Sequence, residues 1–197
     1  MTKPLLQVII GSTRPGRAGG PVADWFAAQA RVDDRFDVEI IDLAEVGLPL
    51  LNEPNHPRLR DYQHEHTKAW SAIIDRADAF VFVIPEYNYA INAATKNAID
   101  YLFHEWAHKP LGIVSYGGIS GGLRAAQILK QIGTALKMVT MPDTVIIPMI
   151  GTLRTPEGGF APTPIIEDSA VQLLDQLSDL TEAMSPLRER ILTAAAN

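Results

Sequence analysis

Short apolar runs alternate with helical patterns along this chain, and this alternation restricts the possible folds more than any other feature of the sequence. Leu5–Gly11 is such a run, as expected for a strand buried on both faces of a parallel sheet. Similar runs occupy Asp78–Ile84, Leu111–Ser115 and Thr144–Pro148. In Phe36–Asp42 apolar and charged residues alternate, which predicts a strand nearer an edge of the sheet.

A helical pattern follows each of these runs. The apolar residues at helical spacing are Val22, Phe26 and Ala30; Tyr62, Trp70 and Ile74; Ile99, Leu102 and Trp106; Leu129, Ile132 and Leu136; and Leu174, Leu177 and Leu180. Strand and helix alternate five times, which predicts a doubly wound α/β sheet with ligands beyond the carboxyl ends of its strands. No linker or repeat divides the 197 residues, so we expect one domain over 1–197.

Composition limits the chemistry. The chain has no cysteine, which excludes thiol nucleophiles and disulfides and requires any redox chemistry to come from a bound cofactor. Its formal net charge of −6 argues against a nucleic-acid partner, because such a partner needs a basic face. No apolar stretch approaches the ~20 residues of a membrane helix. We therefore expect a soluble, cytoplasmic protein without a membrane partner.

The loop after the first predicted strand suits a phosphate. It reads Gly-Ser-Thr-Arg-Pro-Gly-Arg-Ala-Gly-Gly over 11–20 and leads into the first predicted helix, whose N-terminus offers N–H donors. Its side-chain donors are Ser12, Thr13, Arg14 and Arg17. The loop contains neither the GxGxxG motif nor a P-loop, so a mononucleotide fits better than a dinucleotide. The alternative is a solvated turn with ordinary surface arginines.

The loop at 85–92, Pro-Glu-Tyr-Asn-Tyr-Ala-Ile-Asn, follows the most apolar strand. We expect its proline to stop that strand and Asn92 to cap a helix that starts near Ala93. Its backbone, Asn88 and either Tyr87 or Tyr89 could contact a planar ring with a uracil-like edge. A capped turn whose tyrosines pack on a neighbouring subunit is the alternative.

A third loop, Ser-Tyr-Gly-Gly-Ile-Ser-Gly-Gly at 115–122, has four glycines within six residues. Such a density implies positive φ angles or a close approach of the backbone to a ligand. Helix capping alone explains one of these glycines but not four.

Two catalytic motifs match by spacing alone. Gly118–Gly122 has the GxSxG pattern of a hydrolase nucleophile, but every histidine precedes Ser120, whereas the hydrolase histidine follows its serine. His104–His108 has the HExxH pattern of a zinc protease, but Lys109-Pro110 closes the helix at once and no further histidine follows. We therefore reject both interpretations and expect no metal site.

Four segments in order resemble a known family. Gly-Ser-Thr-Arg at 11–14, Pro-Glu-Tyr-Asn at 85–88, Lys-Asn-Ala-Ile-Asp at 96–100 and Ser-Tyr-Gly-Gly at 115–118 resemble the NAD(P)H-dependent FMN reductases, flavodoxin-like flavoproteins that include quinone, azo-dye and chromate reductases. The resemblance covers residues 5–150 or so. It implies a flavodoxin-like, five-stranded parallel sheet in the order 2-1-3-4-5, with helices on both faces. Ala90 and the Asn-Ala-Ala-Thr at 92–95 depart from the usual family residues, which bears on acceptor choice more than on FMN binding.

The resemblance also implies the cofactor and its contacts. The residues carried over are Ser12, Arg14 and Arg17 at the FMN phosphate, Pro85, Glu86, Tyr87 and Asn88 beside the ring, and Ser115, Gly117 and Gly118 on its far side. Similar proteins form homodimers or homotetramers with the site near the interface. The helix predicted over Ala93 to Trp106 has enough apolar residues to make that contact.

We expect a ping-pong reaction in which NADPH or NADH gives a hydride to FMN and a small acceptor then takes the electrons. The acceptor would be a free flavin, a quinone or a similar molecule, and no catalytic side chain is assigned. Two alternatives stay open. One is an FMN-binding electron carrier or redox-responsive binding protein without NAD(P)H turnover, against which Arg14 and Arg17 count. The other is a flavin-free domain that binds another phosphorylated ligand.

Overall fold

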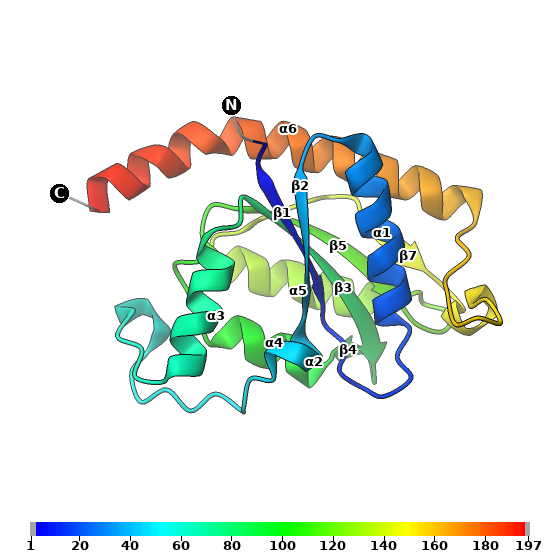
Figure 1. Ribbon diagram of the computed structural model, residues 1–197, viewed down its shortest axis with the longest axis horizontal. Helices are drawn as coiled ribbons and strands as arrows, with labels where there is room; N and C mark the ends of the chain where they lie inside the picture. The colour runs from blue at the N-terminus through cyan, green and yellow to red at the C-terminus, as the bar shows by residue number, and fades with distance from the viewer. Residues whose placement is uncertain (1–2, 196–197) are drawn as a thin grey trace.

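The computed structural model describes residues 3–195 as a twisted sheet between two layers of helices (Figure 1). Its strands are β1 (Leu5–Ile10), β2 (Asp37–Asp42), β3 (Ala79–Tyr87), β4 (Ala90–Ile91), β5 (Pro110–Tyr116), β6 (Val139–Thr140) and β7 (Val145–Ile147). The sheet runs β2-β1-β3-β5-β6, with β7 also paired to β5 and β4 antiparallel to β3. The predicted order 2-1-3-4-5 is therefore confirmed, with the fifth strand divided into β6 and β7.

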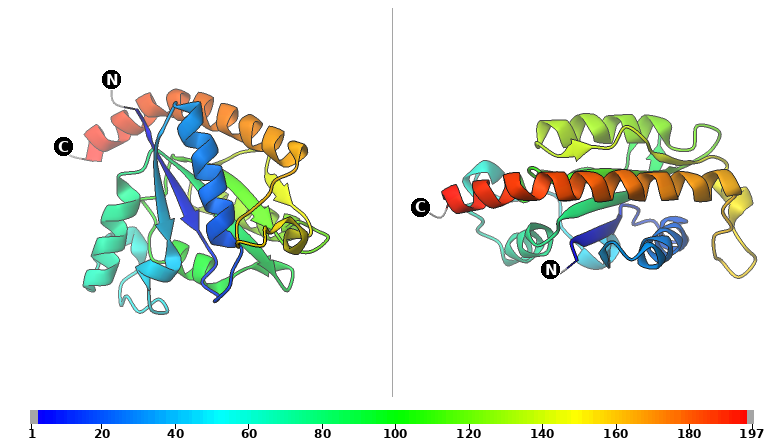
Figure 2. Two further views of the ribbon diagram at one scale, coloured as in Figure 1. Left: turned by 45° about the vertical axis from the view of Figure 1, so that its right-hand side comes forward. Right: turned by 90° about the horizontal axis from the view of Figure 1, so that it is seen from above.

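Helices cover both faces of the sheet (Figure 2). The elements are α1 (Gly19–Asp33), α2 (Leu43–Val46), α3 (Glu65–Asp75), α4 (Ala93–Asp100), α5 (Leu123–Ala135) and α6 (Pro164–Ala195), with 3-10 turns at Pro57–Leu59 and Ile150–Leu153. Residues of α1 and α6 share one apolar core, and those of α3, α4 and α5 share the other. Within residues 3–195, no helix has the length and apolar character needed to cross a membrane.

The central strand β3 shows why the apolar runs become strands. Val81 and Val83 point into the core beside α1 and α6, whereas Phe80 and Phe82 point into the opposite core. All four side chains are fully buried. A strand covered on both faces has no need for alternating polar residues, so its sequence is continuously apolar. By contrast β2 lies at the edge and is only half-buried, as its charged residues predicted.

The prediction that Pro85 stops its strand is wrong. β3 continues through Pro85, which pairs with Tyr116 of β5. The reason is that an N–H group at this position, which proline lacks, would have pointed toward β1. The Val83 carbonyl accepts from Gly11 N–H at 2.9 Å, so Val83 faces β1, and Pro85, two residues on, faces the same side. The last paired residue of β1 is Ile10, so the missing N–H breaks no ladder bond.

The helix predicted from Ala93 to Trp106 is also corrected, because α4 ends at Asp100. The chain then turns, and Trp106 Nε1 donates back to the Ile99 carbonyl at 3.1 Å. Ile99 and Trp106 are fully buried in the core, so they offer no contact surface to a second subunit. His108 has a φ of 62°, which confirms that no helix runs through the HExxH segment.

Helix α6 ties the amino end of the sheet together. Arg188 forms an ion pair with Asp78, just before β3, and Asp78 also accepts a hydrogen bond from the backbone of Leu5 at 2.7 Å. The helix runs along the length of the molecule and contains Pro186 in its interior (Figure 1). Arg188 thus links the end of α6 to the starts of β1 and β3.

Candidate active site

Three loops meet at the carboxyl edge of the sheet. They follow β1, β3 and β5, which are neighbours and parallel, so all three emerge on the same side (Figure 1). Asn92 connects two of them, because its Nδ2 donates to the Gly11 carbonyl at 2.6 Å. Asn92 stands at the predicted N-cap position of α4, but its side chain makes no capping bond to the helix. Its Oδ1 instead accepts from the Thr95 hydroxyl at 2.8 Å.

Two buried hydroxyls lie at the first turn of α1. Ser12 is fully buried and Tyr116 is 5% exposed, and neither Ser12 Oγ nor Tyr116 OH has a hydrogen-bond partner outside this pair in the described part of the chain. A Cβ atom at Gly19 would lie 2.3 Å from Ser12 Oγ and 2.8 Å from Tyr116 OH. A larger residue at position 19 would therefore displace both hydroxyls. Burial raises the pKa of Tyr116 to about 12, so its hydroxyl remains a donor at neutral pH.

The N-terminus of α1 adds backbone donors to these hydroxyls. Ala18 occupies the N-cap position and supplies no side-chain acceptor to the helix. The N–H groups of Gly19 and Gly20 have no acceptor within residues 3–195, and Pro21 has no N–H. Free first-turn donors and the helix dipole favour an anion at this position. The hydroxyls and N–H groups together form a donor set suited to a phosphate.

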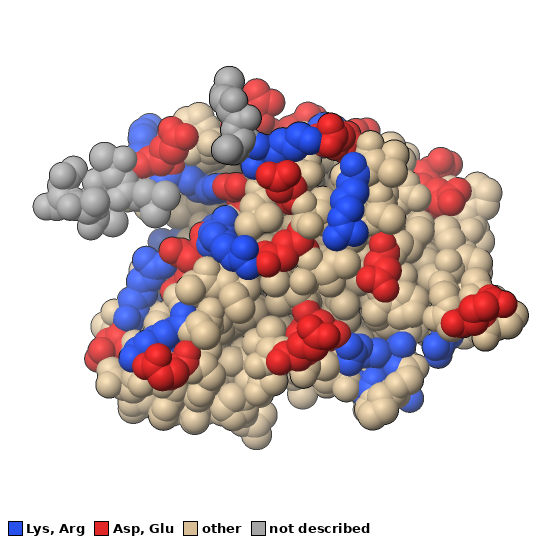
Figure 3. Space-filling model, in the orientation of Figure 1, with Lys and Arg blue, Asp and Glu red and all other residues tan. Residues whose placement is uncertain are grey.

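The two arginines of this loop differ in their surroundings. Arg17 is held by an ion pair with Asp42 at the end of β2, and Asp42 also caps α2. Arg14, like Thr13, is exposed and forms no salt bridge with any described residue. Arg154, which the sequence did not single out, donates to the Gly16 carbonyl at 3.2 Å. Figure 3 shows basic side chains gathered over the loop that joins β1 to α1.

A pocket adjoins this loop on the side of α4. Its volume is about 320 Å³, and its lining residues are Thr13, Leu43, Ala44, Gly47, Leu48, Ala94, Asn97 and Ala98. Asn97 fixes the loop that precedes α3, because its Nδ2 donates to the Pro49 carbonyl at 2.7 Å. The pocket therefore joins the first loop to the start of α4.

Glu86 connects the second and third loops. Its carboxylate accepts from Ser120 Oγ at 3.0 Å, from Arg124 Nη1 at 2.9 Å and from Arg124 N–H at 3.0 Å. Burial alone would raise the pKa of Glu86, but the hydrogen bonds from Arg124 and Ser120 outweigh it and lower the pKa. The Ser120 hydroxyl is thus held by the Glu86 carboxylate. Arg124 also stacks over the Tyr89 ring, 4.1 Å from its centroid.

The third loop uses its glycines for two purposes. Gly121 and Gly122 have φ angles of 61° and 86°, and a Cβ at Gly122 would lie 2.7 Å from Tyr116 N. Gly118 is exposed, and a Cβ there would meet nothing within 4 Å. Ser115 is fully buried, and its hydroxyl donates to the Gly121 carbonyl at 3.0 Å. The structure therefore places Gly118 on the open edge and turns the Ser115 side chain inward.

The second loop is a tight hairpin between β3 and β4. Asn88 and Tyr89 form its two-residue turn with φ angles of 49° and 71°, the left-handed pair that this kind of turn requires. Tyr87 is 40% exposed and Tyr89 68% exposed, whereas Pro85 is buried within β3. With Ile119, 90% exposed, these tyrosines give the carboxyl edge an apolar rim suited to planar rings.

Most of this chain is similar to known proteins of one enzyme family. A match to the NADPH-dependent FMN reductase family covers residues 4–152. An NAD(P)H-dependent FMN reductase of Schizosaccharomyces pombe is 39% identical over 182 residues, which span 91% of this chain and 86% of that protein. One of Saccharomyces cerevisiae is 30% identical, over 88% and 96% of the two chains. The flavoenzyme NAD(P)H:(acceptor) oxidoreductase of Paracoccus denitrificans has the same fold, with a TM-score of 0.70, 21% identity and coverage of 92% and 98%.

Proposed function

This chain belongs to the NADPH-dependent FMN reductase family, and we propose that it binds FMN with the three loops at the carboxyl edge of its sheet. The observation that carries this proposal is the pair of buried hydroxyls, Ser12 Oγ and Tyr116 OH, which lack partners outside the pair beside the N-terminus of α1. A buried hydroxyl without a partner costs free energy, and a phosphate oxygen would remove that cost. Bound FMN would supply the hydride acceptance and electron transfer that no side chain here can provide.

The chain's own contribution is binding and orientation. Ser12, Tyr116 and the first-turn N–H groups of α1 would hold the phosphate, with Arg14 supplying a mobile positive charge. Arg17 would act from its ion pair with Asp42, which fixes the direction of its guanidinium. These groups would stabilise the negative charge of the phosphate by hydrogen bonds. No proton has to be transferred to the phosphate, so its binding needs no general acid.

The ring would lie along the second and third loops. Tyr87, Asn88, Gly117 and Gly118 stand nearest the open edge, whereas Pro85 and Ser115 support the strands behind them. Glu86 would keep the two loops at a fixed separation through Ser120 and Arg124. Its lowered pKa indicates a carboxylate that stays ionised in this role.

NAD(P)H and a small acceptor would use the same open face in turn, which gives ping-pong kinetics. The exposed Tyr89 and Ile119 offer apolar area to a nicotinamide, a quinone or a second flavin. Several relatives are named quinone oxidoreductases or azoreductases, which supports acceptors of this planar type. We also propose a homodimer or homotetramer in which this rim lies near the subunit contact, to be measured by light scattering.

A visible spectrum recorded before and after anaerobic addition of NADPH tests the proposal. Flavin bands that bleach on addition would establish FMN binding and hydride acceptance together. Bands that persist would favour the electron carrier. A protein without flavin bands after incubation with FMN would contradict the proposal and favour a different phosphorylated ligand.

A further inference from the structure

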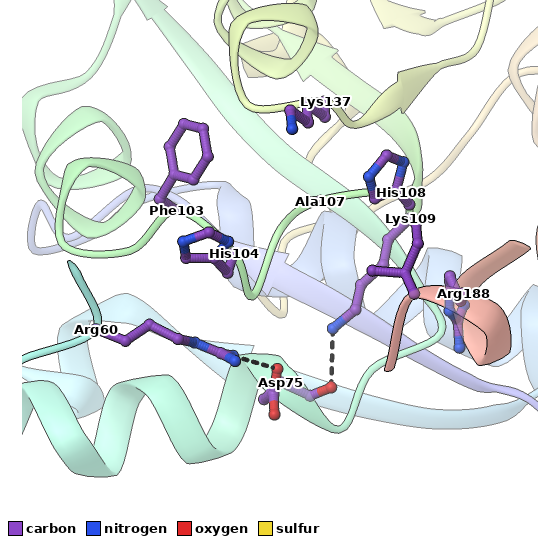
Figure 4. Close-up of a pocket in the computed structure, with 10 residues that line it drawn as sticks. Arg60, Asp75, Phe103, His104, Ala107, His108, Lys109, Lys137 and Arg188 are labelled. Atoms are coloured by element: carbon purple, nitrogen blue, oxygen red, sulfur yellow. Dashed lines mark hydrogen bonds and ion pairs between the residues drawn. The ribbon is translucent and has the colours of Figure 1, made fainter. Parts of the chain in front are cut away.

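A second pocket lies at the amino end of the sheet, at the opposite end of the strands from the three loops. Its volume is about 270 Å³, and Figure 4 shows the side chains that line it. The lining comes from the residue after the 3-10 turn at Pro57–Leu59, the end of α3, the segment between α4 and β5, the turn after α5 and the last turns of α6: Arg60, Asp75, Phe103, His104, Ala107, His108, Lys109, Lys137, Arg188 and Ile191. The proposed FMN site uses none of these residues.

One part of the pocket is apolar. Phe103 is half-buried, and the Arg58 guanidinium covers its ring at 4.5 Å from the centroid. Ala107 and Ile191 complete the wall, and Ile191 is 39% exposed although it is a large aliphatic residue. An aromatic ring and an aliphatic side chain that share a recess form a surface suited to a flat apolar group.

The remainder of the lining carries excess positive charge. Four of its side chains are basic and one, Asp75, is acidic. Arg60 contacts Asp75 at 3.0 Å and the adjacent Glu105 at 3.3 Å, and Arg188 pairs with the adjacent Asp78. Even when these two neighbouring carboxylates are added, four basic groups face three acidic ones. Lys137 forms no salt bridge with any residue in 3–195, so the excess positive charge of the lining lies on Lys137.

Lys109 brings a second ammonium group to the pocket. Its Nζ donates to the carbonyls of Ile74 and Asp75 at 2.8 and 2.9 Å, so two of its three hydrogens have partners. Lys109 is only 6% exposed, and burial lowers its pKa to about 8. The third hydrogen of this ammonium has no nitrogen or oxygen acceptor among the described residues, and the ammonium lies 5.3 Å from the centre of the Phe80 ring.

The backbone holds Lys137 at the rim. Lys137 and His108 each have a φ of 62°, which residues other than glycine seldom adopt. His108 N–H donates to the Lys137 carbonyl at 2.8 Å and joins the two strained positions. Burial, and next the charge of Lys137, lowers the pKa of His108, as expected where a positive charge lacks a counter-ion.

We propose that this pocket binds a small amphipathic organic anion, one planar ring system bearing a carboxylate or sulfonate. The ring would pack against Phe103 and Ile191, and the anionic group would lie beside Lys137 and Lys109. A cavity of about 270 Å³ accommodates a ligand of one or two fused rings. The site does not depend on FMN, so its occupant would bind the protein with or without flavin.

Dimethylaminonaphthalene sulfonate is a suitable probe, because it is a single fused ring system that carries a sulfonate and its fluorescence rises in apolar surroundings. We would titrate it into the FMN-saturated protein with excess NADP⁺, so that the flavin edge is occupied. Saturable binding of one probe per chain is expected. Lys137→Glu and Ile191→Asp should each weaken it by about tenfold, because each places a negative charge beside the bound anion. Lys68→Glu, on the exposed face of α3, should leave the affinity within about twofold.

Absence of saturable binding, or equal affinity in the wild type and both pocket variants, would overturn the proposal. Ile191 and Lys137 are both exposed, so neither substitution removes a core contact, and circular dichroism would verify folding. The flavin spectrum is a separate readout. Loss of flavin bands with intact probe binding would contradict only the proposed function, and the reverse result would contradict only this pocket.

Discussion

At the amino end of the sheet a fully buried carboxylate, Glu105, is surrounded by donors, whereas at the carboxyl edge two buried hydroxyls have no partner outside their own pair in residues 3–195. Glu105 accepts from Ser71 Oγ at 2.7 Å, from Tyr62 OH at 2.9 Å and from Arg60 Nε at 3.3 Å. Burial would raise the pKa of Glu105, but the hydrogen bonds from Ser71 and Tyr62 and the charge of Arg60 lower it.

This difference in hydrogen bonding separates buried groups that stabilise the fold from buried groups that are available to bind a ligand. A buried polar group with partners contributes to stability, and its loss leaves those partners unsatisfied. A buried hydroxyl that bonds no other part of the chain lowers the stability of the chain alone, and a ligand that bonds it removes this cost. Substitutions at the two ends should therefore affect different measurements, stability at one end and FMN affinity at the other.

Glu105→Ala should have the largest effect. It leaves Tyr62, Ser71 and Arg60 facing a cavity, and we expect the free energy of unfolding to fall by about 3 kcal/mol. The affinity for FMN should stay within about twofold. Urea unfolding followed by circular dichroism measures the first quantity, and flavin fluorescence quenching measures the second. Glu65→Ala, at an exposed ion pair on α3, is the control and should change little. A large loss of FMN affinity in Glu105→Ala would break the separation of the two ends.

Gly19→Ala tests the carboxyl edge with a single methyl group. The new Cβ would displace the Ser12 and Tyr116 hydroxyls, and FMN affinity should fall by about 100-fold, or about 2.7 kcal/mol. The neighbouring Gly20→Ala is a matched control, because a Cβ there meets nothing within 4 Å. It should bind FMN like the wild type. Equal affinity in the two variants would mean that the phosphate does not use the hydroxyls beside Gly19.

Two buried serines allow a sharper test at the same edge. Ser12→Ala should lower FMN affinity by about tenfold while leaving the stability of the flavin-free protein unchanged or slightly higher, because the removed hydroxyl had no partner outside its pair with Tyr116. Ser115→Ala should lower stability by about 1 kcal/mol, because it removes the bond to the Gly121 carbonyl. Thermal unfolding without flavin and a flavin titration distinguish the two. A drop in stability for Ser12→Ala would indicate a bond that the chain itself makes.

Lys109 gives an effect of a different kind, which is visible only as a pH dependence of stability. Burial lowers the pKa of Lys109 to about 8 in the folded protein, whereas the pKa of a lysine in an unfolded chain is about 10.4. Between these values the unfolded chain binds the additional proton, so the stability of the wild type should rise with pH relative to Lys109→Met. The slope is at most about 1.4 kcal/mol per pH unit. Urea midpoints of both proteins at several alkaline pH values measure this slope. Parallel curves of stability against pH for the two proteins would contradict the prediction.

Much of the fold follows from local pattern. The apolar run of β3 and the charged alternation of β2 predicted a buried strand and an edge strand, and both predictions are confirmed. The errors arise where distant residues decide. Pro85 continues a strand because β1 has already ended beside it, and α4 ends at Asp100 because Glu105 turns inward to donors that lie 34 to 45 residues earlier.

The site shows the same division between local and distant signals. The donors of the first loop could be predicted because Ser12, Arg14 and the glycines are consecutive in the sequence. Tyr116 and Arg154 could not, since they reach the loop from β5 and from a segment 138 residues away. The resemblance implies that Ser115 and Gly118 both contact the ring. In the structure the Ser115 side chain points inward to the Gly121 carbonyl, whereas Gly118 lies on the open edge.

The link between Arg188, Asp78 and Leu5 also sets an order in time. Asp78 leaves the peptidyl transferase centre 110 residues before Arg188 does. At ordinary translation rates that interval is roughly 5 to 20 s. During this interval Asp78 lacks its counter-ion, so the starts of β1 and β3 are made well before α6 can secure them. Nascent chains stalled short of Arg188 should therefore be cut readily by proteases near Asp78, and released chains that contain Arg188 should resist.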